Sequence, residues 1–173
     1  MKRYLFVDGY NIINGWDELK SIADGISLEE ARNRLIDILS DYKSYTDQNI
    51  YLVFDAHQVK SLSDREDFRV GIHIIYTKEN QTADSYIEVR VSQLAKNRQN
   101  IVRVATSDKA EQQMILGSGG SRISGREFYM EIKESNQKIN KKTNVINNEK
   151  YRLWETLEED IAQKLEELRK KQE

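Results

Sequence analysis

Four short apolar runs, separated by stretches with helical periodicity, constrain the fold of this chain more than any other feature. The runs are Tyr4–Val7, Ile50–Phe54, Ile72–Tyr76 and Ile101–Ala105. The first two are continuous apolar runs, which are typical of strands that are buried on both faces of a sheet, and the last two repeat the pattern with one polar residue inside each. The chain contains no proline, so long helices between these strands can run without interruption.

The segments between the runs carry helix start signals. Ser27 and Glu30 form a capping-box pattern ahead of apolar residues at helical spacing. A second helix is predicted from Thr82 to about Lys96, and Ser107 or Asp108 is expected to cap a third. Strands that alternate with helices predict an α/β sandwich around a mainly parallel sheet.

The C-terminal part of the sequence has a different character. The Gly/Ser-rich stretch 117–121 is expected to separate the core from a helical part, in which Ser124 and Glu127 form a second capping-box pattern. We expect one domain over residues 1–142 and a C-terminal helix over 143–173, packed on the domain or extending from it. An apolar stripe on that helix is expected to make the packing contact; it comprises Leu153, Trp154, Leu157, Ile161, Leu165 and Leu168.

Composition excludes several classes of protein. The absence of cysteine excludes disulfides, thiolate nucleophiles and cysteine-based metal sites, and two histidines are few for an imidazole-rich metal centre. No apolar run approaches the roughly 20 residues that cross a bilayer, and the N-terminal run is too short for a signal peptide. We therefore expect a cytoplasmic protein that has no membrane partner and relies on carboxylates, hydroxyls, amides and amines.

Charge is unevenly distributed along the chain. Residues 1–86 hold 10 Lys and Arg against 15 Asp and Glu, a net charge of −5, whereas residues 87–142 hold 11 against 6, a net charge of +5. An acidic region beside a basic region is compatible with a cation site next to a surface that binds a polyanion. Ordinary solvated helix faces produce the same pattern.

Acidic residues follow the predicted strands. Asp8 directly follows the first strand, Asp55 the second and, three residues on, Asp108 the fourth, while Asp84 lies early in the helix after the third. Residues beyond the carboxyl ends of parallel strands meet at one edge of the sheet, so these acids can converge. Crowded carboxylates repel unless a cation or proton intervenes, and oxygen ligands favour Mg²⁺ or Mn²⁺. The alternative is a purely structural role, in which Asp84 and Asp108 only stabilise the starts of helices.

Two further residues bear on this expected site. Asn11 lies close to the end of the first strand, where its amide can hold a carboxylate, a water or a phosphate oxygen. Glu88 lies one turn after Asp84 on the same helical face, although a glutamate in mid-helix usually faces solvent.

Four segments of the chain resemble a known family. Tyr4–Ile13 resembles the opening motif of the NYN domains, a branch of the PIN-like nucleases. Val53–Ala56, Thr77–Asp84 and Ala105–Asp108 resemble the later blocks of its YacP-like bacterial subfamily, and the similarity runs in order from residue 3 to about 142.

This resemblance implies a PIN-like α/β/α fold and a metal-dependent endoribonuclease, associated with ribosomes and with cleavage of translated mRNA. It implies that Asp8 and Asp84 are the essential metal-binding acids, that Asp55 and Asp108 contribute and that Asn11 supports them. Many PIN-like proteins carry a further acid in the central helix, and Glu88 is the candidate for that position.

Binding of single-stranded RNA requires cations for the phosphates and rings for the bases. The cations expected nearest the site are Lys78, Lys109, Arg122 and Arg126. Tyr10, Trp16 and Tyr129 are candidates for stacking, although aromatic residues at helical spacing more often belong to the core.

The sequence leaves three other functions open. A phosphoacceptor receiver domain would use Asp55 as acceptor, but it would want a second acid beside Asp8, where Val7 and Gly9 stand. A dehalogenase-like phosphatase would want Asp in place of Tyr10. A non-catalytic RNA- or ribosome-binding protein would need none of the acids, so the presence of all four disfavours it.

Overall fold

The computed structural model describes residues 1–55, 65–138, 146, 161 and 164. The chain divides into a compact unit, Met1–Glu134, and a second unit, Ser135–Glu173. Apart from Ile161, the apolar stripe predicted on the last helix lies outside the described residues, and the predicted domain boundary at residue 142 stays a prediction.

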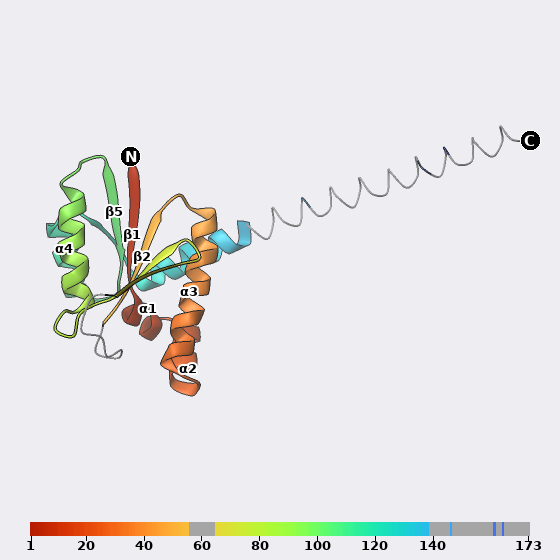
Figure 1. Ribbon diagram of the computed structural model, residues 1–173, viewed down its shortest axis with the longest axis horizontal. Helices are drawn as coiled ribbons and strands as arrows, with labels where there is room; N and C mark the ends of the chain where they lie inside the picture. The colour runs from red at the N-terminus through yellow and green to blue at the C-terminus, as the bar shows by residue number, and fades with distance from the viewer. Residues whose placement is uncertain (56–64, 139–145, 147–160, 162–163, 165–173) are drawn as a thin grey trace, which may run out of the picture. The chain divides into compact units, whose positions relative to one another are not determined.

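A six-stranded sheet forms the centre of the compact unit, in the order β3-β4-β2-β1-β5-β6 (Figure 1). Neighbouring strands are parallel except β3 and β4, which are antiparallel. The predicted α/β class with a mainly parallel sheet is confirmed. The strands are β1 (Lys2–Asp8), β2 (Asn49–Phe54), β3 (Arg65–Arg69), β4 (Ile72–Tyr76), β5 (Asn100–Ala105) and β6 (Ser121–Ile123).

All four apolar runs form strands, and β3 and β6 are additional edge strands. β6 pairs with β5, with Ala105 opposite Ile123. The sheet therefore continues past the Gly/Ser-rich stretch, and the prediction that this stretch ends the core is wrong. Gly119 within it has a φ of +87°, a conformation that favours glycine and reverses the chain into β6.

Helices connect the strands and begin where the capping patterns predict. Ser27 Oγ accepts a hydrogen bond from the Glu30 backbone N–H, and Thr82 caps the helix after β4. Asp108, rather than Ser107, caps the helix after β5. The helices are α1 (Gly9–Gly15), α2 (Asp17–Gly25), α3 (Leu28–Tyr45), α4 (Ala83–Ala95) and α5 (Lys109–Gly117), and residues 125–138 are also helical.

Two apolar cores cover the two faces of the sheet, because successive side chains of a strand point to opposite faces. Leu5 and Val7 of β1 face a core with α1, α2, α3 and Phe128, whereas Phe6 faces a core with α4 and Ile115 of α5. In Figure 1 α4 lies on one side of β1 and β5, and α3 lies on the other side.

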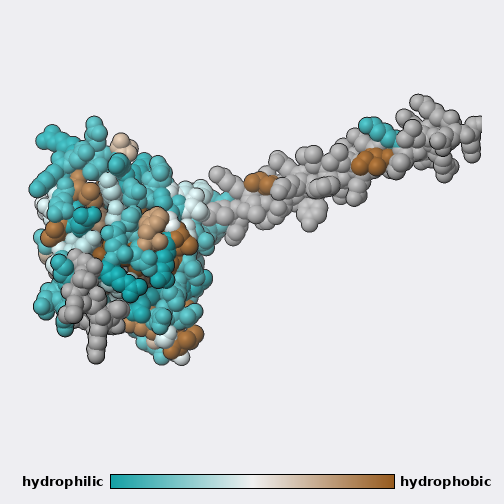
Figure 2. Space-filling model, viewed as in Figure 1, coloured by the Kyte–Doolittle hydropathy of each residue, from teal (hydrophilic) through white to brown (hydrophobic). Residues whose placement is uncertain are grey.

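The outer surface of the compact unit is mainly hydrophilic in the view of Figure 2, with small separate apolar patches. In the described part of the chain, no helix combines the length and the apolar character that spanning a bilayer requires.

Candidate functional site

The carboxyl ends of the parallel strands place the predicted acids at one edge of the sheet. Asp8 is the last residue of β1 and lies opposite Val53 in β2, while Val7 lies opposite Ala105 in β5. Asp55 follows β2 directly, and Asp108 follows β5 by three residues. The strand register therefore brings the starts of α1 and α5 to the same edge.

Three carboxylates converge there. One oxygen each of Asp8, Asp84 and Glu111 lies within 4.8 Å of the others. Asp8 ends β1, Asp84 lies in the first turn of α4, and Glu111 lies in the first turn of α5. Asp8 is 8% exposed and Glu111 is 2% exposed, so two of the three acids are removed from bulk water.

Burial raises the pKa values of all three acids. It raises the pKa of Asp8 to about 7, although a hydrogen bond from the Asn11 backbone N–H opposes the rise and the charges of Asp84 and Asp55 add to it. Burial raises the pKa of Glu111 to about 8, with Thr106 opposing and Asp8 among the charges that add. The pKa of Asp84 is raised by burial and then by Asp108 and Asp55. Ionising this cluster is therefore costly without a cation.

Polar atoms without partners support a cation at this point. Both carboxylate oxygens of Glu111 are buried, and the Thr106 hydroxyl, which has a single proton, can satisfy at most one of them. In the same part of the chain no lysine or arginine forms an ion pair with Asp8, Asp84 or Glu111. Buried acceptors without donors are rare in native proteins, and three hard oxygen donors are the set that Mg²⁺ or Mn²⁺ takes. The residues present therefore fit a divalent metal ion.

Asp55 and Asp108 accept backbone hydrogen bonds beside the cluster. Asp55 Oδ1 accepts from the Ala83 N–H at 2.5 Å, at the start of α4. Asp108 Oδ1 accepts from the Ala110 and Glu111 N–H groups at 2.7 and 3.1 Å. These bonds orient the helices that carry Asp84 and Glu111, and the metal-binding roles predicted for Asp55 and Asp108 stay predictions.

Asn11 connects two strand ends. Its side-chain Oδ1 accepts from the Ser107 N–H at 2.7 Å, and its own backbone N–H donates to Asp8 Oδ1 at 3.2 Å. Asn11 therefore ties the loop after β5 to the end of β1, and its predicted supporting role stays a prediction.

Gly9, the first residue of α1, allows close packing on β2 because it has no side chain. A Cβ atom at this position would overlap the ring of Phe54, the last residue of β2. Close packing of α1 on β2 therefore depends on glycine directly after Asp8.

The structure also places the other candidates. Glu88 is half-buried in α4 and is not one of the three clustered acids. Lys78 follows β4 and Lys109 begins α5, both exposed near the carboxyl edge of the sheet. Arg122 is exposed in β6 and lies 4.0 Å from Glu127, and Arg126 is exposed in the helix 125–138.

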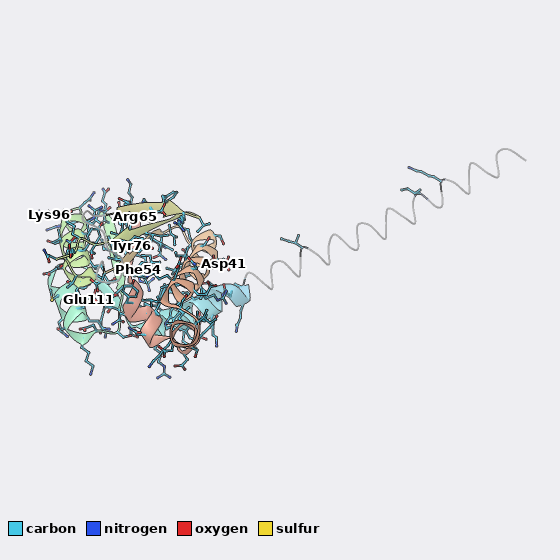
Figure 3. The ribbon with its side chains drawn as sticks, turned by 60° about the horizontal axis from the view of Figure 1, so that its bottom comes forward. Asp41, Phe54, Arg65, Tyr76, Lys96 and Glu111 are labelled. Atoms are coloured by element: carbon cyan, nitrogen blue, oxygen red, sulfur yellow. The ribbon has the colours of Figure 1, made fainter. Side chains whose placement is uncertain are left out.

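Glu111 is the clustered acid that the sequence reasoning missed. It lies in the first turn of α5 and is labelled in Figure 3. A signal was present, since Glu111 lies one turn after Asp108, just as Glu88 lies one turn after Asp84. Sequence spacing alone does not distinguish these two glutamates.

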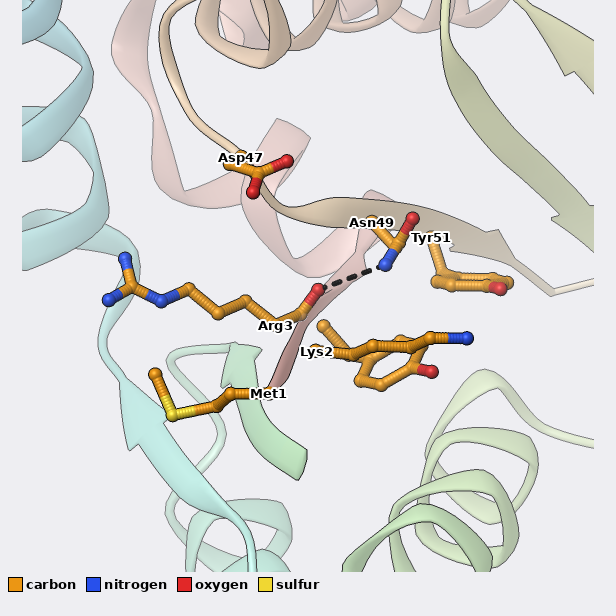
Figure 4. A pocket seen from close by; sticks show the side chains of 7 residues that line it. Met1, Lys2, Arg3, Asp47, Asn49 and Tyr51 are labelled. Atoms are coloured by element: carbon orange, nitrogen blue, oxygen red, sulfur yellow. Dashed lines mark hydrogen bonds between the residues drawn. The ribbon is translucent and has the colours of Figure 1, made fainter. Parts of the chain in front are cut away.

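A cavity of a different character lies at the opposite end of β1 (Figure 4). It measures about 640 Å³ and is lined by residues that include Lys2, Arg3, Tyr4 and Tyr51. Its one carboxylate belongs to Asp47, and the Asn49 amide donates to the Arg3 carbonyl at 3.3 Å. This cavity lacks the clustered acids and is not the candidate metal centre.

Comparisons with known proteins show which family the chain belongs to. Residues 5–170 match the YacP-like NYN domain family, a family of nuclease-type domains. A Bacillus subtilis (strain 168) protein named YacP is 39% identical over 166 residues, which cover 96% of each chain. The crystal structure of Rae1 (YacP) from B. subtilis matches with a TM-score of 0.72 and 38% identity over 96% of this chain and 94% of that one. A tryptophan-to-leucine mutant of Rae1 matches with a TM-score of 0.72 and 39% identity, over 83% and 82% of the two chains. The chain therefore belongs to the YacP-like NYN domain family.

Proposed function

We propose that this protein is a metal-dependent endoribonuclease that cleaves single-stranded RNA. The observation that carries the proposal is the convergence of three carboxylates, two of them buried (Asp8 and Glu111) and one half-buried (Asp84), without a cationic partner among the described residues. A nuclease-family domain with such a cluster fits phosphodiester hydrolysis. A receiver domain would instead have a second acid adjacent to Asp8, and a dehalogenase-like phosphatase would have one two residues after it; neither acid is present.

Each residue near the cluster has a distinct part in this proposal. Asp8, Asp84 and Glu111 hold Mg²⁺ or Mn²⁺, with Asp55 and Asp108 contributing charge and orienting the helix starts. The bound ion supplies an activated water and neutralises charge that develops on the phosphodiester. Asn11 is a positioning residue, because it fixes the loop after β5 against Asp8 (2.7 Å to the Ser107 N–H).

The RNA backbone is held by cations around the acidic edge. We assign this role to Lys78, Lys109, Arg122 and Arg126, all of which are exposed. The resemblance to the YacP-like NYN nuclease domains supports RNA as the substrate, and we propose that mRNA on the ribosome, in the cytoplasm, is its physiological form.

Cleavage assays with matched variants test the proposal. Purified full-length protein is incubated with mRNA, with and without translating ribosomes, in the presence of Mg²⁺ or Mn²⁺. We expect cleavage that EDTA, Asp8→Asn and Glu111→Gln each abolish. Glu88→Gln removes a carboxylate from α4 outside the cluster and is the matched control, so it should cleave like the wild type.

Two outcomes would overturn the assignment. Cleavage that persists unchanged in EDTA or in Asp8→Asn would place the chemistry elsewhere. A protein that binds RNA or ribosomes with normal affinity but never cleaves would be the non-catalytic binding protein considered above.

A further inference from the structure

A second cavity lies where α1 ends and α2 begins, against the start of the helix 125–138. It measures about 260 Å³ and is lined by Gly15, Trp16, Asp17, Glu18, Arg126 and Tyr129. Pockets for drug-sized ligands span roughly 300–1,000 Å³. A cavity just below that range suits a single planar ring system, such as one nucleobase.

Hydrogen bonds connect this pocket to the candidate metal centre. The Trp16 indole N–H donates to the Gly125 carbonyl at 2.8 Å, and the Gly125 N–H donates to Ser107 Oγ at 3.1 Å. The Ser107 N–H in turn donates to Asn11, whose backbone N–H donates to Asp8. The pocket wall is therefore attached to the same loop that carries Asp108, at the edge of the sheet where the acids converge.

The two aromatic residues of the pocket differ in how much of each side chain is exposed to solvent. Trp16 is 5% exposed and forms a wall, whereas Tyr129 is half-buried. The Tyr129 ring packs edge-on against Trp16 with centroids 5.3 Å apart, and Lys133 Nζ lies 4.8 Å from the Tyr129 centroid. Tyr129 is thus held in place while part of its ring remains available to a base.

Charges around the pocket indicate which part of a nucleotide it accepts. The carboxylates of Asp17 and Glu18 repel a phosphate but accept hydrogen bonds from the N–H groups of a base. Glu18 pairs with Arg34 at 2.9 Å, while the carboxylate of Asp17 has no hydrogen bond or ion pair within the described residues. Arg126 is exposed and positively charged, so a phosphate is held outside the pocket, at its rim.

We propose that this pocket binds one base of a single-stranded RNA, stacked on Tyr129 with Arg126 on the adjoining phosphate, next to the cleaved bond. The inference rests on the proposed endoribonuclease function and adds a base-binding subsite to it. It also unites Trp16, Arg126 and Tyr129, three RNA-contact candidates from distant parts of the sequence, in one place.

Binding measurements without cleavage test the subsite. The background is the full chain with Asp8→Asn in EDTA, and the probes are a short single-stranded RNA and a series in which one base at a time is removed. Affinity is measured by fluorescence anisotropy. We expect removal of one particular base to weaken binding about tenfold, the size of one lost stacking contact.

Variants of the pocket residues test whether the base whose removal weakens binding is the one that stacks on Tyr129. Adding Tyr129→Leu should weaken binding of the intact RNA about tenfold and cancel the penalty for removing the particular base. Tyr129→Phe keeps the ring and should bind like the background. Arg126→Ala should reduce the dependence of RNA affinity on salt concentration by the amount expected for about one lost phosphate contact. Lys96→Ala removes a charge at the end of α4, outside the pocket lining, and should leave the base-removal profile unchanged.

The proposal fails if Tyr129→Leu binds intact RNA as tightly as the background, or if the base-removal penalty is the same with and without the ring. Thermal unfolding checks that Tyr129→Leu folds, and the exposed Arg126→Ala provides an independent reading if it does not. If the protein cleaves RNA with metal but Tyr129→Leu does not change the base-removal penalty, the subsite alone is refuted. If Tyr129→Leu cancels that penalty but the wild type never cleaves, the nuclease function alone is refuted.

Discussion

Replacing Asp8 with asparagine should change the stability of the metal-free protein in a pH-dependent way. Asp8 is 8% exposed and its pKa is raised from 3.8 to about 7. Between these two values the folded protein keeps a proton that the unfolded chain has lost. The free energy of unfolding of the wild type therefore falls as pH rises from about 4 to about 7, and the loss is complete above that range.

The size of this effect follows from the shift. A rise from 3.8 to about 7 corresponds to about 4 kcal/mol, as an order of magnitude, at about 1.4 kcal/mol for each pKa unit. Asparagine stays neutral and keeps an oxygen for the Asn11 N–H, so it avoids this cost without losing the cap of α1. We expect Asp8→Asn and the wild type to differ little near pH 4, and the variant to be more stable by about 2–4 kcal/mol near pH 8.

Urea unfolding in EDTA at the two pH values measures this difference directly. Asp37→Asn, which neutralises an exposed carboxylate on α3, is the control and should show no comparable pH dependence. Added Mg²⁺ or Mn²⁺ should stabilise the wild type near pH 8 by mass action and leave Asp8→Asn unchanged. A difference between Asp8→Asn and wild type that is the same at both pH values, or a variant that is less stable near pH 8, would refute the reasoning.

Three further predictions concern the metal and the packing around the site. The apparent affinity for Mn²⁺, measured by titration calorimetry, should increase as pH rises through about 7 to 8, because the clustered acids must lose protons to bind; a flat profile would contradict the raised pKa values. Gly9→Ala should lower the free energy of unfolding by about 1–3 kcal/mol through overlap with Phe54, whereas Gly25→Ala, with open space around its Cβ position, should cost little; equal effects in urea unfolding would exclude the steric explanation. Trp16→Phe should cost about 1–3 kcal/mol in the same assay, because the Gly125 carbonyl loses its buried donor; a neutral result would mean that water replaces the indole.

The strands that the sequence predicted are those that are buried on both faces. Tyr4–Val7 and Ile50–Phe54 lie inside the sheet, so their apolar character is continuous and easy to recognise. β3 (Arg65–Arg69) is an edge strand that contains one apolar residue, Phe68, which is 64% exposed. Its pairing is decided by the antiparallel register with β4, Phe68 lying opposite His73, and not by its own composition.

The position of the acidic site was also predictable in part. Asp8 and Asp84 follow from the rule that the carboxyl ends of parallel strands share an edge, together with the family resemblance. Their burial and raised pKa values were not predictable, because both depend on the distance between the first turns of α4 and α5 at this edge.

Glu111 shows why the third acid escaped the sequence reasoning. Asp108 and Glu111 have the spacing of a capping box, in which the glutamate turns back to accept the N–H of the capping residue. Ser124 and Glu127 complete such a box, with the Ser124 N–H donating to Glu127 Oε2 at 2.8 Å. At α5 the Asp108 N–H donates instead to Thr106 Oγ1 at 3.1 Å, so the cap does not need the glutamate. The side chain of Glu111 is then available to join Asp8 and Asp84, and two identically spaced motifs differ in outcome because of a hydroxyl that lies outside the motif.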